Sequence, residues 1–202
     1  LLHGRYRAGR DLGRGGFGTV IEGLDTRTGR RVALKSLSQA KPEDLSRLKQ
    51  EFRALQSLHH ENLVRLDALF EHEGTCTVAM EHLEGTDFIS YVREGGALDE
   101  TRLRGALVGL LHGTAFLHEA GFVHRDLNPE NVLVTPEGRV VLLDFGLMTP
   151  MEPSARDAAS GRLYMAPEQA ESAEFEASAD VYSIGACLYM ALTGQLPFEQ
   201  FT

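Results

Sequence analysis

The chain has 202 residues, of which 43% are hydrophobic and 24% are charged, and its formal net charge is −9. This length suits one large domain or two small lobes, with enough residues to bury a core. The acidic charge argues against nucleic acid and anionic membranes as partners, because both attract clustered Lys and Arg side chains.

The two cysteines, Cys76 and Cys187, lie far apart inside apolar runs. Neither a disulfide framework nor a zinc-binding spacing is visible, so we expect buried thiols in a reducing compartment, which predicts a cytoplasmic location. The first ten residues have no apolar core after their charges and do not resemble a signal peptide. The longest apolar run, residues 181–192, is too short to span a bilayer.

The first 80 residues are predicted to form mostly antiparallel strands and one helix. Short apolar runs on both sides of residues 26–29, "TRTG", predict two strands joined by a turn. Residues 41–58 then place apolar side chains three and four residues apart, which predicts a helix that begins near Pro42. Residues 62–70 and 75–83 are predicted to be two further strands.

After residue 85 the pattern becomes helical. Leucines from Leu103 to Leu117 predict a long amphipathic helix, along which Gly105, Gly109 and Gly113 recur every fourth residue. We interpret these glycines as a site of close packing against a neighbouring helix, because the charged flanks of the segment exclude a membrane dimer motif.

Two short strands are predicted on either side of a turn at residues 135–138. The last helix, at residues 181–192, is apolar on nearly every side, which predicts that it is buried. The predicted fold class is therefore α+β with two lobes. A small antiparallel-sheet lobe with one helix covers residues 1–80, a hinge covers 81–85, and a mainly helical lobe covers 86–202.

The segment "GRGGFGTV", residues 13–20, places Gly13, Gly15 and Gly18 between two predicted strands. Glycines let the backbone N–H groups approach a phosphate closely. Glycine-rich hairpins are also common as plain turns, so this pattern alone leaves both interpretations open. A strand follows it, whereas a helix follows the glycines of a dinucleotide-binding fingerprint.

Lys35 ends the segment "VALK" on the next predicted strand, and Glu51 lies on the apolar face of the predicted helix. A carboxylate on an apolar face needs a partner, because an unpaired buried charge costs free energy. Lys35 is the candidate partner, and the pair would direct the ammonium group at the phosphates of a nucleotide. A lone lysine on a strand is otherwise an ordinary solvated charge.

Three polar residues follow in a fixed order, namely Asp126 in "HRD", Asn131 five residues later, and Asp144 in "DFG". Two carboxylates and an amide around one point can supply oxygen ligands to divalent cations and can orient a hydroxyl that accepts a phosphoryl group. Each triplet alone is a common chance match, but their order, with predicted strands between them, favours phosphoryl transfer.

With "APE" at residues 166–168 and "DVYSIG" at 180–185, these motifs resemble a eukaryotic-type (Hanks-type) Ser/Thr protein kinase domain of the bacterial-like branch. The resemblance implies that Asp126 is the catalytic base and that Asn131 and Asp144 are the metal ligands. It implies a set of ATP contacts, namely Gly13, Gly15, Gly18, Val20, Ala33, Lys35, Met80, Glu81, Leu83, Asp87 and Leu133. It also implies a stacked spine of Leu55, Leu66, His124 and Phe145, held from below by Asp180.

The implied cofactors are ATP and Mg²⁺, or Mn²⁺ in its place, and the implied partner is a protein substrate. Glu130 matches a position that often reads a basic residue, so a basic substrate is expected. Ser160 and Thr149 match a segment in which such kinases are autophosphorylated, with Arg125 as the residue that receives the phosphate. The family's usual last helices do not follow Thr202, so further domains or a partner are expected to cover the large lobe.

Two nearby positions depart from the family pattern. Asn128 stands where these kinases usually have a lysine that steadies the transferred phosphoryl group, and Gly161 stands where they have a threonine that hydrogen-bonds the catalytic Asp. We expect Arg162 to replace the missing lysine by reaching Asp126 or the phosphate from the opposite side. The alternative is a solvent-facing Arg162 and a slow enzyme.

Three functions are open at this point. The retained Lys35, Asp126 and Asp144 favour an active Ser/Thr protein kinase. Asn128 and Gly161 favour a nucleotide-binding pseudokinase-like module with regulatory or scaffold function and little or no transfer. A kinase of small molecules is the third alternative, because the altered residues belong to the protein-substrate platform of the family.

Overall fold

The computed structural model describes residues 2–15, 18–37, 42–72, 75–144, 161–171 and 176–197. The chain divides into two compact units. Unit 1 comprises Leu1–His59 and Val64–Leu83, and unit 2 comprises His60–Leu63 and Glu84–Thr202. The sequence did not indicate that the four residues from His60 to Leu63 would belong with the second unit.

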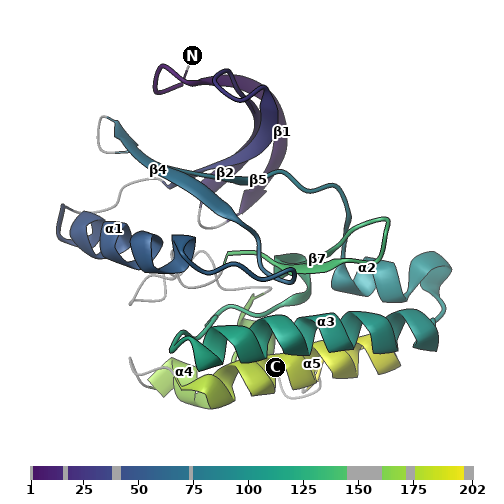
Figure 1. Ribbon diagram of the computed structural model, residues 1–202. Coiled ribbons are helices and arrows are strands. Elements are labelled where there is room, and N and C mark those ends of the chain that lie inside the picture. The colour runs from purple at the N-terminus through teal and green to yellow at the C-terminus, as the bar shows by residue number, and fades with distance from the viewer. Residues whose placement is uncertain are drawn as a thin grey trace. The chain divides into compact units, whose positions relative to one another are not determined.

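Unit 1 contains an antiparallel sheet of five strands in the order β1-β2-β3-β5-β4, with helix α1 beside β4 (Figure 1). The strands are β1 (Tyr6–Gly15), β2 (Gly18–Asp25), β3 (Arg30–Leu37), β4 (Leu66–His72) and β5 (Thr75–Glu81), and α1 spans Pro42–Gln56. The predicted strand-turn-strand is confirmed, since β2 and β3 pair directly and Gly29 adopts a φ of 71° in the turn between them.

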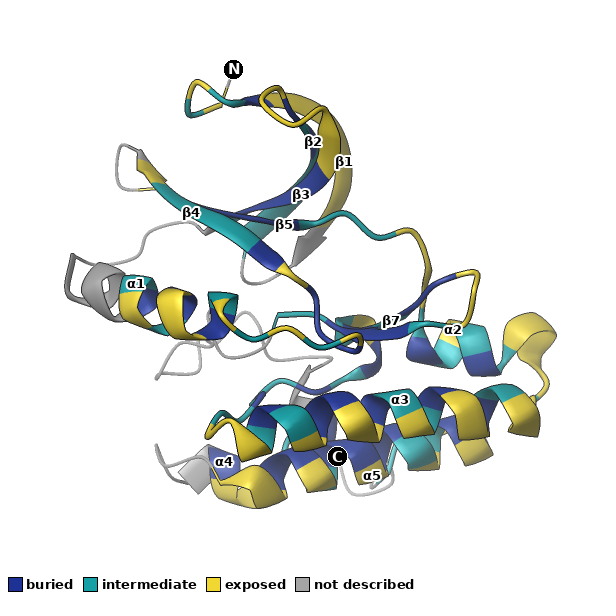
Figure 2. Cartoon of the chain, viewed as in Figure 1, coloured by how far each residue is buried: buried dark blue, intermediate teal, exposed yellow. Residues whose placement is uncertain are grey.

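The core of unit 1 lies around the central strands β3 and β5, in which residues 32–35 and 76–80 are buried without interruption. Val32 and Leu34 on β3 are buried with Tyr6 of β1 and Ala79 of β5. Figure 2 shows β3 and β5 as largely buried strands. Leu48, Phe52 and Leu55 supply the buried side of α1, and their spacing of four and three residues is the helical period that the sequence displays.

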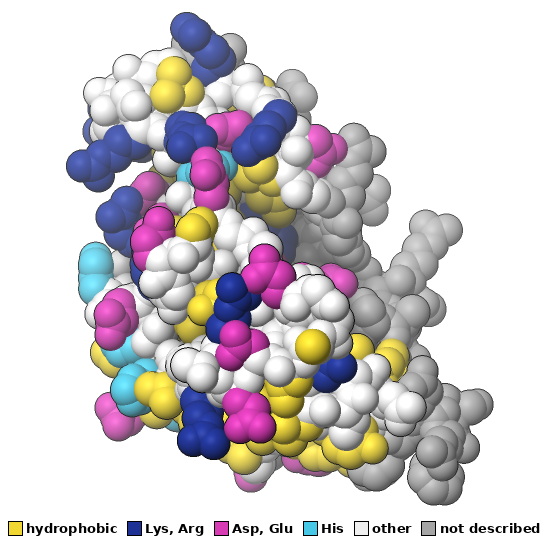
Figure 3. Space-filling view, turned by 90° about the vertical axis from the view of Figure 1, so that its right-hand side faces the viewer, with side chains coloured by type: hydrophobic (Ala, Val, Ile, Leu, Met, Phe, Trp, Pro, Cys, Tyr) yellow, Lys and Arg dark blue, Asp and Glu magenta, His cyan; other side chains and the backbone are white. Residues whose placement is uncertain are grey.

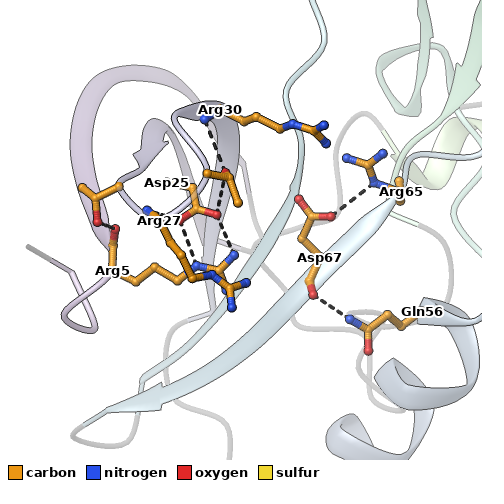
Figure 4. A network of polar contacts seen from close by, with 9 residues as sticks. Arg5, Asp25, Arg27, Arg30, Gln56, Arg65 and Asp67 are labelled. Carbon is orange, nitrogen blue, oxygen red and sulfur yellow. Dashed lines mark hydrogen bonds and ion pairs between the residues drawn. The ribbon is translucent and has the colours of Figure 1, made fainter.

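Arg5 and Asp25 join the N-terminal segment to the end of β2 (Figure 4). The guanidinium donates from Nε and Nη2 to the two carboxylate oxygens of Asp25 at 2.9 and 2.6 Å. The backbone N–H of Arg27 and the hydroxyl of Thr28 donate to the same carboxylate at 3.0 and 2.9 Å. Asp25 is 2% exposed, and these hydrogen bonds, that of Arg5 above all, lower the pKa of its carboxyl below the ordinary value.

Unit 2 is mainly helical and contains a small antiparallel sheet, β6-β7-β8. Helices α3 and α5 lie side by side below that sheet (Figure 1). The strands are β6 (Thr86–Asp87), β7 (Val132–Val134) and β8 (Val140–Leu142), the helices are α2 (Phe88–Val92), α3 (Glu100–Glu119), α4 (Pro167–Glu171) and α5 (Ala177–Thr193), and short 3-10 helices are η1 (Glu94–Gly96), η2 (Pro129–Asn131) and η3 (Gly161–Tyr164). The α+β fold class is confirmed.

The glycines of α3 do not pack against a helix, which corrects the expectation from their spacing. A Cβ atom on Gly109 would lie 2.8 Å from Cβ of Val140 on β8, and one on Gly113 would lie 3.0 Å from the backbone oxygen of Asn62. A Cβ on Gly105 would meet nothing within 4 Å. Helix α3 therefore packs closely against β8 and the segment His60–Leu63, and only Gly109 and Gly113 lie at this contact.

Asn62 explains why its segment belongs to unit 2. Its Nδ2 donates to the backbone oxygen of Val140 at 2.7 Å, and its backbone oxygen accepts from the N–H of Leu142 at 2.9 Å. Leu63 forms a parallel bridge with Leu142. The strand predicted over residues 62–70 therefore begins later, at Leu66, because the first of these residues pair with β8 instead of β5.

Helix α5 is not buried on every side, contrary to the expectation from its apolar sequence. Val181, Tyr189 and Leu192 are 62%, 44% and 53% exposed. Hydrophobic side chains lie open at the lower edge of Figure 3, at the height of α3 and α5. The opposite face of α5 is buried, with Ile184 and Cys187 among its residues. Within the described residues nothing covers the open face.

The two thiols are both buried, as expected. Burial raises the pKa of Cys187 to about 12, so this thiol stays protonated at neutral pH. In the part of the chain that the structure describes, no helix combines the length and apolar character that crossing a membrane requires.

Candidate active site

The carboxylate of Asp126 is held through both of its oxygens. Asn131, the last residue of η2, donates from Nδ2 to Oδ2 of Asp126 at 2.7 Å. Asn128, the residue before η2, donates from Nδ2 to Oδ1 of Asp126 at 3.1 Å. Both amides also donate to the backbone oxygen of Asp126, at 2.8 Å from Asn131 and 3.3 Å from Asn128. This segment thus fixes the direction in which Asp126 points.

Burial raises the pKa of Asp126 above the ordinary value for a carboxyl, whereas nearby His124 and the two amide hydrogen bonds oppose the rise. His124 is fully buried and its pKa is lowered, because burial disfavours the imidazolium. Its Nε2 contacts the backbone oxygen of Leu143 at 2.8 Å, and a carbonyl can only accept, so Nε2 carries the proton. A neutral His124 therefore links the Asp126 segment to the residue before Asp144.

Asp180 of α5 holds the backbone of the same segment. Its Oδ2 accepts from the N–H of His124 at 2.8 Å, and its Oδ1 accepts from the N–H of Arg125 at 2.9 Å. Arg125 has a φ of 73°, a left-handed conformation that is unfavourable for a side chain of this size. Its backbone oxygen accepts from Nε2 of Gln169 at 3.0 Å. The backbone N–H and the backbone oxygen of Arg125 are thus both held by buried side chains, those of Asp180 and Gln169.

Asn131 and Asp144 are joined through the backbone, because the N–H of Leu143 donates to the oxygen of Asn131 at 2.8 Å. The side-chain Nδ2 of Asn131 is directed at Asp126, so the side-chain Oδ1 of Asn131 is the atom that could bind another ligand. An amide oxygen and a carboxylate are hard oxygen donors, and Mg²⁺ is typically bound by one or two such protein ligands together with phosphates. The donor set therefore fits the predicted cation.

In unit 1, one face of the sheet brings together four of the predicted ATP contacts. Val20 on β2 lies directly opposite Lys35 on β3, and Ala33, two residues earlier on β3, lies opposite Met80 on β5. Directly paired residues share a face, as do residues two apart on a strand. Lys35 is 4% exposed, so its side chain is buried on this face.

The hairpin of β1 and β2 carries the three glycines. Gly13 pairs with Val20 and Gly15 pairs with Gly18, whose φ of 133° is a conformation that a side chain would hinder. Glu51 lies on α1, in the same unit as Lys35. Their pairing stays a prediction.

A family model described as "Protein kinase domain" matches residues 6–202 of the chain. The chain belongs to the protein kinase domain family. This kinase domain is 30% identical to a probable serine/threonine-protein kinase PknB of Bifidobacterium longum, over 98% of its length. It is 36% identical to serine/threonine-protein kinase pkn2 of Myxococcus xanthus and 34% identical to probable serine/threonine-protein kinase SCO3848 of Streptomyces coelicolor, also over 98% of its length.

The kinase domain spans only 31%, 25% and 31% of these three proteins, so it corresponds to a third or less of each. A crystal structure of Rad53 in complex with AMP-PNP is similar over 100% of this chain and 52% of the Rad53 chain. The TM-score is 0.82 and the sequence identity is 30%. The two-lobed fold that the sequence predicted is therefore that of known kinases.

Several predicted residues of the kinase domain lie outside the described part of the chain, namely Phe145, Thr149 and Ser160. Gly161 and Arg162 lie in the backbone of η3, but the Arg162 side chain is also outside what is described. The replacement of the missing lysine by Arg162 stays a prediction.

The remaining predicted contacts divide between the units. Glu81 and Leu83 lie at the end of unit 1, whereas Asp87 and Leu133 lie opposite each other on β6 and β7 of unit 2. The Asp87 carboxylate also accepts from the N–H of Ser90 at 3.0 Å and caps α2. Capping of α2 is by itself a sufficient reason for an aspartate at this position, so the predicted contact of Asp87 with the ribose of ATP stays a proposal.

Two residues that shape the site were not predicted. His118 of α3 contacts Oδ2 of Asp180 through Nε2 at 2.8 Å. Gln169 holds the backbone of Arg125, and its Oε1 accepts from the N–H of Ala166 at 3.0 Å. Gln169 directly follows the "APE" motif and is buried, whereas Pro167 and Glu168 before it are exposed, so its role became visible only in the structure.

Proposed function

We propose that this kinase domain transfers the γ-phosphoryl group of ATP to serine and threonine hydroxyls of protein substrates, including its own. The observation that carries the proposal is the Asp126 carboxylate, which Asn128 and Asn131 hold through both oxygens. Kinase catalysis consists mainly of positioning and electrostatic stabilisation, so a fixed carboxylate at the catalytic base position is the central requirement.

In the proposed reaction the substrate hydroxyl oxygen attacks the γ-phosphorus of ATP. The bond between the γ-phosphorus and the bridging oxygen breaks, and ADP leaves with that oxygen. The hydroxyl proton passes to Asp126, whose carboxylate Asn128 and Asn131 hold through both oxygens. The proton then leaves to solvent as the phosphorylated product departs, which returns Asp126 to its starting state.

Each unit carries residues that match the nucleotide contacts of the family. Lys35, oriented by Glu51, would contact the phosphates of ATP, the glycine hairpin of Gly13, Gly15 and Gly18 would cover them, and Glu81 and Leu83 would offer backbone groups to the base. Asn131 and Asp144 would hold Mg²⁺, which neutralises phosphate charge when bound. The amide oxygen of Asn131 and the carboxylate of Asp144 would also bind Mn²⁺, which prefers the same kind of oxygen ligands.

A basic protein segment is the substrate that charge favours. Unit 2 carries seven Lys and Arg side chains against nineteen Asp and Glu. Glu130 is exposed next to the Asp126 segment, where a substrate arginine could approach it. Clustered carboxylates attract basic chains and raise the rate of encounter.

The test is incubation of the chain with Mg-ATP and a generic basic protein, followed by intact-mass measurement of both proteins. We expect mass increments of one phosphate group on the basic protein and on the chain, and none with Asp126→Asn. Asp144→Asn should lower the affinity for ATP in magnesium without changing the affinity for ADP in its absence. Binding of ATP without any transfer by the unmutated chain would overturn the proposal.

The pseudokinase alternative is not favoured. The similar proteins are named serine/threonine-protein kinases, and the chain keeps Lys35, Asp126, Asn131 and Asp144. The departure at Asn128 does not leave a gap in the site, because its amide contacts Asp126.

A further inference from the structure

The side chain of Asn128 is used at both ends. Its Oδ1 accepts from the backbone N–H groups of Glu130 at 3.0 Å and of Asn131 at 3.2 Å, which caps the N-terminus of η2. Two N–H donors require an oxygen as acceptor, so the orientation of the amide is set by the hydrogen-bond network. The NH₂ group must therefore point away from η2.

That NH₂ group lies on Asp126, at 3.1 Å from Oδ1. Asn131 makes the corresponding contact with Oδ2, so the carboxylate lies between two amides that are three residues apart on one short segment. A rotation of the carboxylate would break one of the two bonds. Because Pro129 is buried and fills the first position of η2, the segment that carries both amides is itself fixed.

A lysine at this position could not make the same contacts. An ammonium group has three donors and no acceptor, so it cannot cap η2. Asn128 combines a cap and a donor, but it brings no charge to the phosphate. Its contribution has to be the orientation of Asp126.

We propose that Asn128 is a positioning residue of the transfer reaction, because its capped amide fixes the Asp126 carboxylate in the orientation that accepts the hydroxyl proton. The inference rests on the proposed kinase activity. It assigns a role in the reaction to a neutral side chain at a position where the family usually has a lysine. Since Asn128 acts through Asp126, its loss should lower the rate of transfer and leave nucleotide binding unchanged.

Asn128→Ser is the decisive variant. Serine is as good an N-cap as asparagine, but its hydroxyl is too short to cap η2 and reach Asp126 together. We expect kcat to fall by roughly 10- to 100-fold, as for other losses of positioning. The KM for ATP and the midpoint of thermal unfolding should stay unchanged. Asn128→Asp also keeps the cap but places a second carboxylate beside Asp126, so its kcat should be lower still.

Asn128→Ala is the control for a merely structural effect, because it removes the cap of η2 as well as the contact with Asp126. We expect its kcat to fall as far as that of Asn128→Ser, whereas only Asn128→Ala should lower the midpoint of thermal unfolding. The inference is overturned if Asn128→Ser transfers phosphate at the unmutated rate, whether or not Asn128→Ala loses activity. An unmutated chain that binds ATP but transfers nothing overturns the proposed function, and the inference with it, so the two failures are distinguishable.

Discussion

Asp25 is buried and ionised, and it joins two segments that are twenty residues apart in the sequence. Its carboxylate accepts four hydrogen bonds, of which the two from Arg5 are charge-assisted. We therefore expect Asp25→Asn to lower the free energy of unfolding by about 2 kcal/mol at pH 7, because hydrogen bonds to charged groups contribute that much. Urea denaturation monitored by circular dichroism measures the change.

This effect should depend on pH with a defined sign. The folded-state pKa of Asp25 lies below its value in the unfolded chain, which is about 3.9. The stabilisation is therefore complete above about pH 5 and is lost as pH falls through the unfolded value toward the folded one. The difference between the unmutated chain and Asp25→Asn should shrink from pH 7 to pH 3. A difference that stays constant over this range would contradict the assignment.

Glu22→Gln is a matched control for Asp25→Asn. Glu22 pairs with Arg10 at 3.2 Å and with Arg31 at 3.5 Å, but those arginines are 67% and 57% exposed. Exposed ion pairs contribute only about 0–1 kcal/mol, since water screens them and the side chains lose freedom. This variant should change the free energy of unfolding much less than Asp25→Asn does.

Lys35 lies on the predicted ATP-facing side of β3 with 4% of its surface exposed. We expect Lys35→Met to lower the rate of transfer by at least about 100-fold, because a fixed positive charge at a phosphate is lost. Methionine fills a similar volume, and the predicted partner Glu51 is only half-buried, so water can solvate its carboxylate and the fall in the midpoint of thermal unfolding should be small. Initial rates and differential scanning calorimetry test both parts. Transfer at the unmutated rate would remove Lys35 from the site.

Helix α3 carries two kinds of glycine that look identical in the sequence. Gly109 faces Val140, whereas Gly105 has open space where a side chain would be. Glycine costs about 1 kcal/mol relative to alanine inside a helix. We therefore expect Gly105→Ala to raise the free energy of unfolding by about 1 kcal/mol.

At Gly109 the same substitution should have the opposite effect. A new methyl group would lie 2.8 Å from Cβ of Val140, so β8 or α3 must shift, and such overpacking costs about 1–3 kcal/mol. Chemical denaturation of Gly105→Ala and Gly109→Ala gives the comparison. If both variants were stabilised equally, the packing of α3 against β8 would be wrong.

Elements with a strong local pattern could be predicted from the sequence. The three- and four-residue spacing of Leu48, Phe52 and Leu55 gave α1, and the apolar runs around Gly29 gave β2 and β3. The place of Asn62 could not be predicted, because its partner Val140 is 78 residues away and no local pattern links them.

The site shows the same division. The Asn-Pro pair at Asn128 and Pro129 is a local signal for the start of a helical turn, and η2 begins there. The hydrogen bond from Asn128 to Asp126 depends on how the whole segment turns back on itself, which spacing alone does not specify. The motif residues could be named from the sequence, but the contacts among them could not.

The open face of α5 is an apolar surface that is exposed to water among the described residues. Val181, Tyr189 and Leu192 are exposed on a helix whose one charged residue, Asp180, is buried. Exposed apolar surfaces of this kind promote association. We expect Val181→Lys combined with Leu192→Lys to lower the self-association of this 202-residue chain, and to change the free energy of unfolding by no more than about 0.5 kcal/mol.

Sedimentation velocity at increasing protein concentration measures that association. Ala186→Lys is the control, because Ala186 lies on the buried face of α5 at 5% exposure and should unfold the chain instead. An unchanged sedimentation profile for Val181→Lys with Leu192→Lys would show that this face does not mediate contact between copies.

The segment His60–Leu63 also sets the order in which the chain can fold. It is made before any residue of β8, so during synthesis Asn62 and Leu63 precede their partners Val140 and Leu142 by 78 and 79 residues. Closing a loop of that length is slow, because the entropy of the loop is lost before the contact contributes any stabilising free energy. Because the chain crosses between the units at three points, a cut between Leu83 and Glu84 would remove from unit 2 the side chain that caps the Val140 oxygen. We expect unit 2 to complete its folding only after β8 has been synthesised, because the partners of its earliest segment lie there.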